Sequence, residues 1–144
     1  MTSFKYLLFF TLLLNITLSV SGQDIVGKWK TIDDNSGKAR SIIEIYKEAG
    51  KYYGKVSELI LEEGDDPDPI CDKCEDHRKD QKVIGMNIIQ DMELDKDEYT
   101  GGEILDPENG KIYRCKLWLE NKDELKVRGY LYFFFRTQTW YRVS

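Results

Sequence analysis

Two short segments at opposite ends of the chain constrain its fold more than any other feature. Gly27–Trp29 lies near the N-terminus, and the C-terminal segment Arg136–Arg142 reads RTQTWYR. The first and last strands of a chain become neighbours only when a sheet closes into a barrel. At such a seam a glycine lets two backbones approach closely, an indole can plug the barrel end, and a guanidinium can lie over the indole face. The two segments therefore predict a small antiparallel β-barrel.

Short strand-like runs separated by turn residues fill the space between these ends. Turns are predicted at Asp33–Gly37 and Asp106–Gly110, because their residues bond their own backbone or tolerate positive φ. A long loop is predicted at Glu62–Gln81 and an aromatic corner at Tyr132–Phe135. The predicted strands are Ile25–Ile32, Ala39–Lys47, Lys51–Leu61, Ile84–Leu94, Glu98–Leu105, Lys111–Glu120, Glu124–Leu131 and Thr137–Val143. Eight strands favour an all-β, up-and-down barrel, since closure removes exposed edges; a two-sheet sandwich is the alternative.

The first 22 residues resemble an export signal. They combine Lys5, an apolar stretch from Tyr6 to Val20 and a small residue, Gly22, at the end. The apolar stretch is about 15 residues, short of the roughly 20 needed to span a membrane. We therefore expect a signal peptide at residues 1–22, a single barrel domain at residues 23–144 with no membrane span, and a periplasmic or secreted protein.

The charge balance argues against nucleic acid as a partner. Without Lys5, the 21 Lys and Arg become 20, against 26 Asp and Glu, which gives the remaining chain a net charge of −6. A surface of that sign repels a phosphate backbone. The partner that we expect is instead a small apolar ligand.

Metal or redox chemistry could be argued only for the Cys71–His77 stretch. Cys71, Cys74 and His77 supply three ligands where structural zinc takes four, and the many neighbouring carboxylates disfavour a reactive thiolate. A structural Cys71–Cys74 disulfide is the preferred interpretation, closing a short loop for roughly 2 kcal/mol. Cys115 is then a buried, unreactive thiol. The Asp65–Asp68 run lacks the spacing of a helix-loop-helix calcium site. We predict neither cofactor nor bound metal.

The chain has no complete catalytic constellation, because the sole candidate for a base near neutral pH is His77 in the same loop. A ligand pocket is better motivated, since an eight-stranded barrel is either filled by side chains or hollow enough for one small ligand. The candidate lining residues are Trp29, Tyr53, Tyr113 and Trp140. Arg128 and Arg142 are candidate anchors for a ligand carboxylate. The same aromatic residues could simply pack the core, with the arginines stacked on them.

Several motifs also carry a resemblance to a known family. They are Gly27–Thr31, Tyr53–Val56, Cys71–Cys74, Gly102–Pro107, Val127–Tyr130 and Arg136–Arg142. In these the chain resembles an uncharacterised exported bacterial family, domain of unknown function 2147 (DUF2147), with a lipocalin-like barrel. The resemblance implies a Gram-negative periplasmic or secreted protein and raises the expectation of a small apolar ligand. It implies no established reaction.

Two functional hypotheses follow. The first is an exported lipocalin-like barrel that binds a small hydrophobic or amphipathic molecule, with the Glu62–Gln81 loop near the barrel mouth. The second is a cell-envelope protein–protein interaction module with a side-chain-filled barrel, which uses the Phe133–Phe135 corner as its contact surface.

Overall fold

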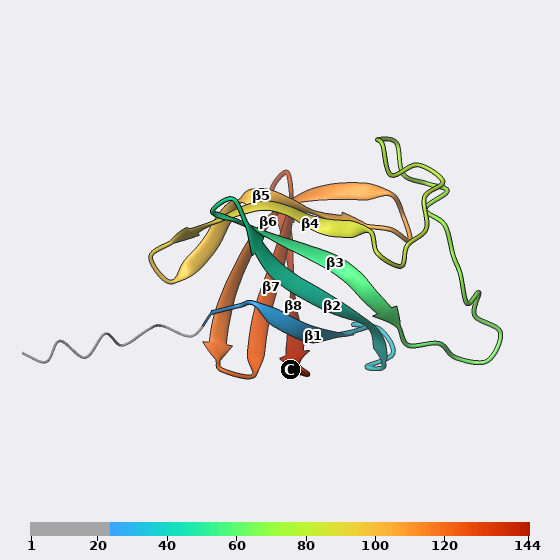
Figure 1. Ribbon diagram of the computed structural model, residues 1–144, viewed down its shortest axis with the longest axis horizontal. Coiled ribbons are helices and arrows are strands. Elements are labelled where there is room, and N and C mark those ends of the chain that lie inside the picture. Colours follow the sequence, from blue (N-terminus) through green and yellow to red (C-terminus); the bar gives the residue numbers. More distant parts are fainter. Residues whose placement is uncertain (1–23) are drawn as a thin grey trace, which may run out of the picture.

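The computed structural model describes residues 24–144, which form a closed, up-and-down antiparallel barrel (Figure 1). Each strand pairs with its neighbours in the sequence, and β1 pairs with β8 to close the circle. The eight strands are β1 (Gly27–Ile32), β2 (Ala39–Glu48), β3 (Lys51–Leu59), β4 (Asn87–Asp95), β5 (Glu98–Asp106), β6 (Lys111–Asn121), β7 (Glu124–Leu131) and β8 (Phe134–Arg142). The prediction of an eight-stranded all-β barrel is confirmed, and the sandwich alternative is wrong.

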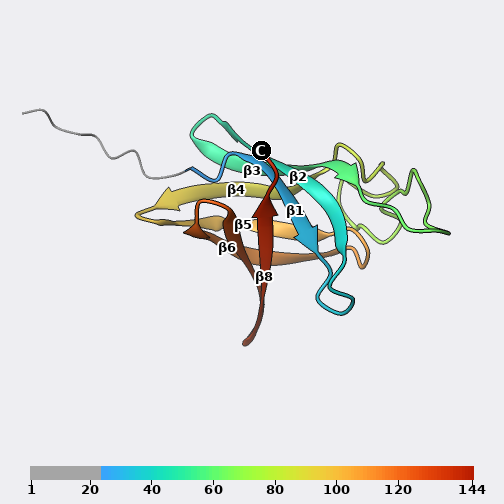
Figure 2. The same cartoon turned by 90° about the horizontal axis from the view of Figure 1, so that it is seen from below.

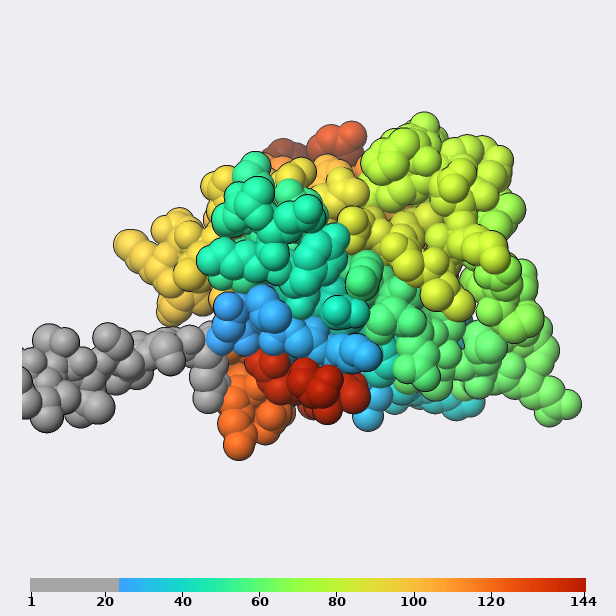
Figure 3. All heavy atoms as spheres, in the orientation of Figure 1, coloured from blue at the N-terminus to red at the C-terminus, as the bar shows by residue number. Residues whose placement is uncertain are grey.

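The seam between β1 and β8 is short and carries the contacts that the chain ends predict. Figure 3 shows β1, in blue, against the red C-terminal strand. Only Trp29 with Arg142 and Lys30 with Tyr141 are paired in register, and Lys28 exchanges further backbone hydrogen bonds with Val143 and Ser144. Gly27 is required here, because a Cβ on it would lie 2.5 Å from the Ser144 carbonyl oxygen. The two chain ends can therefore approach this closely only because Gly27 has no side chain.

Arg142 fastens this end of the barrel. Its Cζ lies 4.2 Å from the centroid of the Trp29 ring. Its guanidinium donates hydrogen bonds to the carbonyl oxygens of Lys122, Val26 and Asp24. Trp29 is fully buried, and its indole N–H donates to the Ile25 carbonyl oxygen at 2.8 Å. The Arg142 side chain therefore connects the residues before β1, the β6–β7 turn and Trp29, the indole that fills this end of the barrel.

The inward side chains fill one half of the barrel. Trp29, Met92, Leu117 and Leu125 have no exposed surface and lie near the end where β1 begins and β8 finishes. The opposite, open end carries the β1–β2 turn, the long segment between β3 and β4, the β5–β6 turn and the β7–β8 hairpin. In Figure 1 that long segment lies to the right and the β4–β5 hairpin to the left.

Two predicted strand starts differ from the structure by three residues, whereas the other strand boundaries agree to within two residues. β4 begins at Asn87 and not at Ile84, because Gly85 turns the chain at a φ of 89° and donates its N–H to Val56. β8 begins at Phe134 and not at Thr137, because Tyr132 adopts a φ of 55° and shortens the expected aromatic corner to a tight hairpin turn. A two-residue turn whose first residue has a positive φ matches the twist of paired strands.

The signal-peptide prediction falls on residues 1–22 and lies outside the described residues. Between residues 24 and 144, no helix is long and apolar enough to cross a membrane.

Replacing Arg142 should weaken closure more than replacing a second stacked arginine. Arg142→Gln loses the contact with Trp29 and its charged hydrogen bonds, so we expect a loss of about 2–3 kcal/mol in the free energy of unfolding. Arg128→Gln is the matched control, because Arg128 also lies over aromatic rings but on the outer wall; its expected cost is about 1 kcal/mol. Urea denaturation measures both, and equal losses would contradict the role of Arg142 in closure.

Candidate functional site

The open half of the barrel holds a cavity of about 870 Å³. Every strand contributes to its lining, from Thr31 on β1 to Trp140 on β8. The buried part of the wall is apolar and consists of Ile43, Val56, Val83, Ile88, Leu105, Val127 and Trp140. Ligand pockets typically measure about 300–1,000 Å³ and have mostly apolar walls. The cavity is therefore of the size and character that accommodates one small molecule.

The β1–β8 seam parts toward the open end, where the cavity lies. No register pair joins the two strands beyond Lys30 and Tyr141, although β8 extends back to Phe134. Side chains bridge the gap there: Arg136 forms an ion pair with Asp34 of the β1–β2 turn, and the amide nitrogen of Gln138 donates to Asp34 at 3.2 Å. The wall is closed by backbone pairing at one end and by side chains at the other.

The polar groups inside the cavity mostly bond to one another. The Trp140 indole N–H donates to the Gln138 side-chain oxygen at 3.1 Å. The Asn109 amide donates to the Tyr113 hydroxyl at 3.2 Å. The Thr31 and Ser41 hydroxyls share a hydrogen bond of 2.8 Å. The cavity wall thus offers a guest an apolar surface with its own polar groups already partnered.

The mouth of the cavity is acidic. Of the charged residues that line it, the acids are Asp33, Asp65, Asp66, Asp72, Asp106 and Glu108, and the bases are Arg40, Lys73 and Arg136. Arg40 donates to Glu108 at 3.2 Å and lies 3.8 Å from Asp65, and its pKa is raised chiefly by that hydrogen bond to Glu108. Arg136 is paired with Asp34. Both arginines at the mouth are therefore already neutralised by carboxylates.

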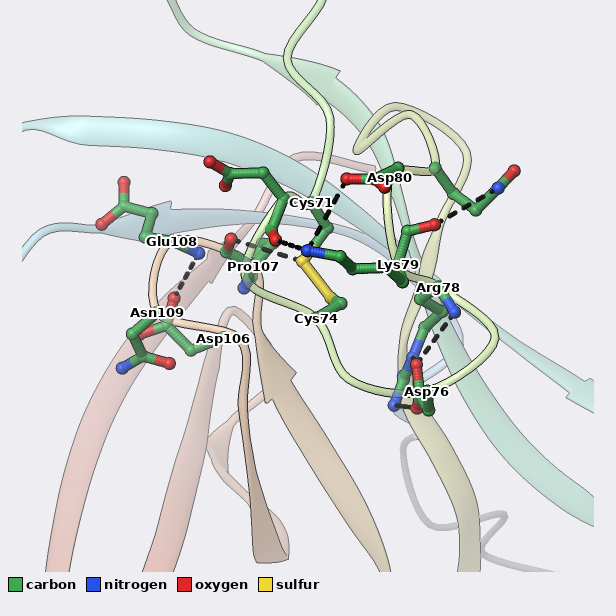
Figure 4. Close-up of a disulfide and its surroundings, with 12 residues drawn as sticks. Cys71, Cys74, Asp76, Arg78, Lys79, Asp80, Asp106, Pro107, Glu108 and Asn109 are labelled. Carbon is green, nitrogen blue, oxygen red and sulfur yellow. Dashed lines mark hydrogen bonds and ion pairs between the residues drawn. A yellow bond between two sulfur atoms is a disulfide. The ribbon is translucent and has the colours of Figure 1, made fainter.

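A disulfide fixes the long segment beside the mouth (Figure 4). Cys71 and Cys74 are joined and almost fully buried, which confirms the predicted pairing. The Cys71 sulfur lies 3.5 Å from the Pro107 carbonyl oxygen. Gly110 of the same β5–β6 turn packs so closely that a Cβ on it would lie 2.0 Å from the Lys73 carbonyl oxygen. The disulfide loop and the β5–β6 turn thus form one rigid side of the mouth.

Arg78 is the buried charge that the sequence did not reveal. It is 3% exposed, and its guanidinium donates to both carboxylate oxygens of Asp76 and to the Asn87 carbonyl oxygen. Hydrogen bonds from Arg78 are the main reason why the pKa of Asp76 is lowered from 3.8 to about 2. Figure 4 shows this pair below the disulfide. The contact ties the long segment to the start of β4.

The structure brings only two of the six predicted ligand-binding residues to the cavity. Tyr113 and Trp140 line it. Trp29 lies below it as the plug, with Arg142 over its ring. The residues that line the cavity include neither Tyr53 nor Arg128.

Tyr53 and Arg128 lie on the outer wall instead. The Tyr53 ring stacks on Tyr46 and its hydroxyl donates to Asp91. Arg128 lies over the rings of Trp118 and Phe135. The alternation along β3 and β7 accounts for this placement, because Gly54 and Val127 take the inward positions next to them.

The other candidate groups do not assemble into a reactive site. Burial raises the pKa of the Cys115 thiol to about 12. His77 is exposed and lines a separate outer groove of about 510 Å³. Among residues 24–144 no group of three or more His, Cys, Asp or Glu side chains is placed to hold a metal. Because their thiols are joined, Cys71 and Cys74 cannot serve as thiolate ligands of zinc.

Comparison with known proteins agrees with this architecture. Residues 27–142 match the bacterial family described as "Uncharacterized protein conserved in bacteria (DUF2147)". The chain belongs to this family. The match spans all eight strands of the barrel, from the first residue of β1 to the last of β8.

A solved structure shares the fold of this DUF2147 protein. It is described as "Protein HP1028 from the human pathogen Helicobacter pylori belongs to the lipocalin family". The two superpose with a TM-score of 0.72 at 19% identity, and the match covers 85% of each chain. The barrel is therefore lipocalin-like. No curated protein matches the chain.

The Asp76–Arg78 pair should make stability depend on pH in the acid range. The folded-state pKa of Asp76 lies below its ordinary value, so its contribution is present above about pH 4 and is lost as the pH falls toward 2. Asp76→Asn should cost about 1–2 kcal/mol at neutral pH, after discounting for the partial exposure of the carboxylate. Unfolding by urea across pH measures the difference, which should shrink below pH 4.

A suitable control is Asp97→Asn, which removes the same charge from the exposed β4–β5 turn. This variant should stay close to the parent protein at every pH. A loss for Asp76→Asn that is independent of pH would show that the ionised carboxylate is not what stabilises the loop.

Proposed function

We propose that this protein binds one small amphipathic molecule in the open half of its barrel. The observation that carries the proposal is the cavity of about 870 Å³, with an apolar wall and a polar mouth. A filled barrel is the alternative architecture for an interaction module, and the cavity favours binding. The lipocalin-like fold is compatible with a small ligand, although fold alone does not establish one.

The apolar part of the guest would lie against Val127 and Trp140, with Tyr113 nearer the mouth. Burying an alkyl or ring surface against such a wall gains about 25 cal/mol for each Å² removed from water. The wall needs no rearrangement of its own hydrogen bonds, because the Trp140 N–H is satisfied by Gln138. The deep part of the site would thus recognise shape and apolar surface and not a specific polar group.

The head group of the guest should be neutral or positively charged. Six acids and three bases line the mouth, and two of those bases are held by carboxylates. A free carboxylate would enter a region of negative potential without an available guanidinium. Neither Arg128 nor Arg142 lines the cavity, so the carboxylate anchor considered from the sequence is not available there.

We further propose that the protein acts outside the cytoplasm, in the periplasm or after secretion. The disulfide supports an oxidising compartment. Residues 1–22 would then serve as the signal peptide.

Narrowing the cavity should abolish binding without unfolding the barrel. Gly129 lines the cavity, and a Cβ on it would lie 3.4 Å from the Cβ of Tyr113, which is an ordinary contact. Gly129→Leu should therefore place its side chain in the cavity and weaken binding of a neutral fluorescent naphthylamine probe at least tenfold, a loss of about 1.4 kcal/mol or more. Fluorescence titration measures the affinity.

Thr139→Leu is the matched control, because it adds a similar apolar group to the outer face of β8. It should bind the probe like the parent protein. If Gly129→Leu also binds normally while its thermal unfolding is unchanged, the cavity is not the binding site.

The charge of the head group can be tested with single-chain amphipaths that share one alkyl chain. Cationic and neutral members should bind more tightly than the carboxylate, measured by quenching of tryptophan fluorescence below the micelle concentration. Raising the salt concentration should narrow the difference, since exposed charges are screened. Preference for the carboxylate would contradict the proposed role of the acidic mouth.

A further inference from the structure

The tip of the β7–β8 hairpin exposes a run of large apolar side chains. Tyr132 is 87% exposed, Phe133 97%, Phe134 78% and Phe135 61%. Leu131 precedes them and is 41% exposed. We call residues 131–135 the aromatic tip. Such residues normally lie inside a protein, so their gathering at one turn requires an explanation.

The aromatic tip is about as large as the largest apolar patch that a typical monomer leaves in water. Each aromatic side chain offers about 150–250 Å², so the four exposed rings present roughly 600 Å². The largest patch on a typical monomer measures about 300–600 Å² and is often functional. The tip also extends away from the other strands, as the lower end of β8 shows in Figure 2.

The rings near the tip are held in a fixed arrangement. The Arg128 guanidinium carbon lies 4.9 Å from the centroid of Trp118 and 4.5 Å from that of Phe135. The Tyr130 and Phe135 rings lie 6.2 Å apart. Arg128 also donates to the Thr137 hydroxyl at 2.7 Å. This preorganisation lowers the ordering cost of an association that uses the tip.

The charge of this hairpin is opposite to that of the rest of the protein. Residues 125–144 contain Lys126, Arg128, Arg136 and Arg142 and no Asp or Glu, although the whole chain carries a net charge of −5. Of these bases, Arg136 is paired with Asp34, and Arg142 lies over Trp29 at the closed end of the barrel. Lys126 and Arg128 lie on the outer face, two and four residues along β7 from Glu124. Two cations on the outer face of β7, Lys126 and Arg128, therefore lie on the same hairpin as the aromatic tip.

The aromatic tip also stands beside the cavity. Leu131, Phe134 and Phe135 are among the residues that line its mouth. Whatever surface the tip contacts is consequently brought next to the entrance of the barrel.

We propose that the aromatic tip inserts into the surface of a bilayer containing anionic phospholipid. Aromatic side chains suit the boundary between head groups and acyl chains, and basic residues beside an apolar insertion add attraction to anionic lipids. A protein partner fits less well, because a convex tip of roughly 600 Å² is below the ~800 Å² per partner of a stable interface. Docking in this way would bring the cavity mouth beside the bilayer, which is a source of amphipathic molecules.

Vesicle sedimentation tests the proposal. The protein of residues 23–144 is used, because an apolar leader would bind lipid by itself. It should bind vesicles of phosphatidylcholine with phosphatidylglycerol more tightly than vesicles of phosphatidylcholine alone, and salt should weaken the difference. Phe133→Ser with Phe134→Ser should reduce binding to the anionic vesicles at least tenfold.

Two further variants separate insertion from general effects. Leu94→Ser with Val143→Ser removes two side chains that are 53% and 54% exposed away from the tip, and it should bind like the parent. Lys126→Gln should weaken binding to anionic vesicles about fivefold, the loss expected for one surface cation. Phe133→Trp should retain binding, and brominated acyl chains should quench the emission of the new indole.

Several results would overturn the proposal. They are an absence of binding to anionic vesicles, equal binding by the tip variant and the parent, or a Phe133→Trp indole that brominated lipid does not quench. Loss of self-association in the tip variant, without a change in vesicle binding, would assign the tip to a second copy of this chain. Probe binding in the cavity is measured without vesicles. A failure of the vesicle experiment therefore does not contradict the proposed ligand binding, and a failure of the probe titration does not contradict the proposed membrane contact.

Discussion

The contact between Arg142 and Trp29 is the interaction on which the rest of the molecule depends. It joins the two ends of the chain across a seam with only two register pairs, and it holds the indole that fills one end of the barrel. A barrel without this seam would be a sheet with two exposed edges. Gly27 contributes by having no side chain, because any Cβ would collide with the last residue of the chain. Closure is therefore achieved with few backbone bonds and one well-placed cation.

The filled and hollow halves of the barrel coincide with the paired and parted ends of this seam. Where β1 and β8 pair, large apolar side chains meet and exclude water. Where they part, side chains from Arg136 and Gln138 reach across to Asp34 and leave room between the walls. The cavity keeps its shape because its mouth is braced. The Cys71–Cys74 disulfide packs on the β5–β6 turn, and Arg78 ties the same segment to β4.

Charge divides the open end into two regions with different consequences. The mouth collects carboxylates from the β1–β2 turn, the long segment and the β5–β6 turn, whereas the β7–β8 hairpin carries bases and aromatic rings. In our proposals, the acidic mouth selects the charge of the ligand head group. The hairpin determines which surface the protein contacts. The sequence does not show which of these charges meet, because neighbours around a barrel mouth come from turns far apart in the chain.

The sequence by itself determined the eight strands, their antiparallel order, the closure and the disulfide. Alternating side chains and turn residues are local signals that predict strands and their connections. Cys71 and Cys74 are three residues apart, and the only other cysteine in the sequence is Cys115, so their pairing could also be predicted. Only the tertiary structure decided which aromatic residues face the cavity. Trp29 and Trp140 both point inward, yet one plugs the closed end and the other lines the cavity. A period of two predicts the face of a strand, but the depth of a residue in a barrel depends on the register of every pairing around it. Likewise, Arg78 lies in a run of charged residues, and its burial depends on hydrogen bonds to Asp76 and to the Asn87 carbonyl oxygen. No local sequence pattern predicts those contacts.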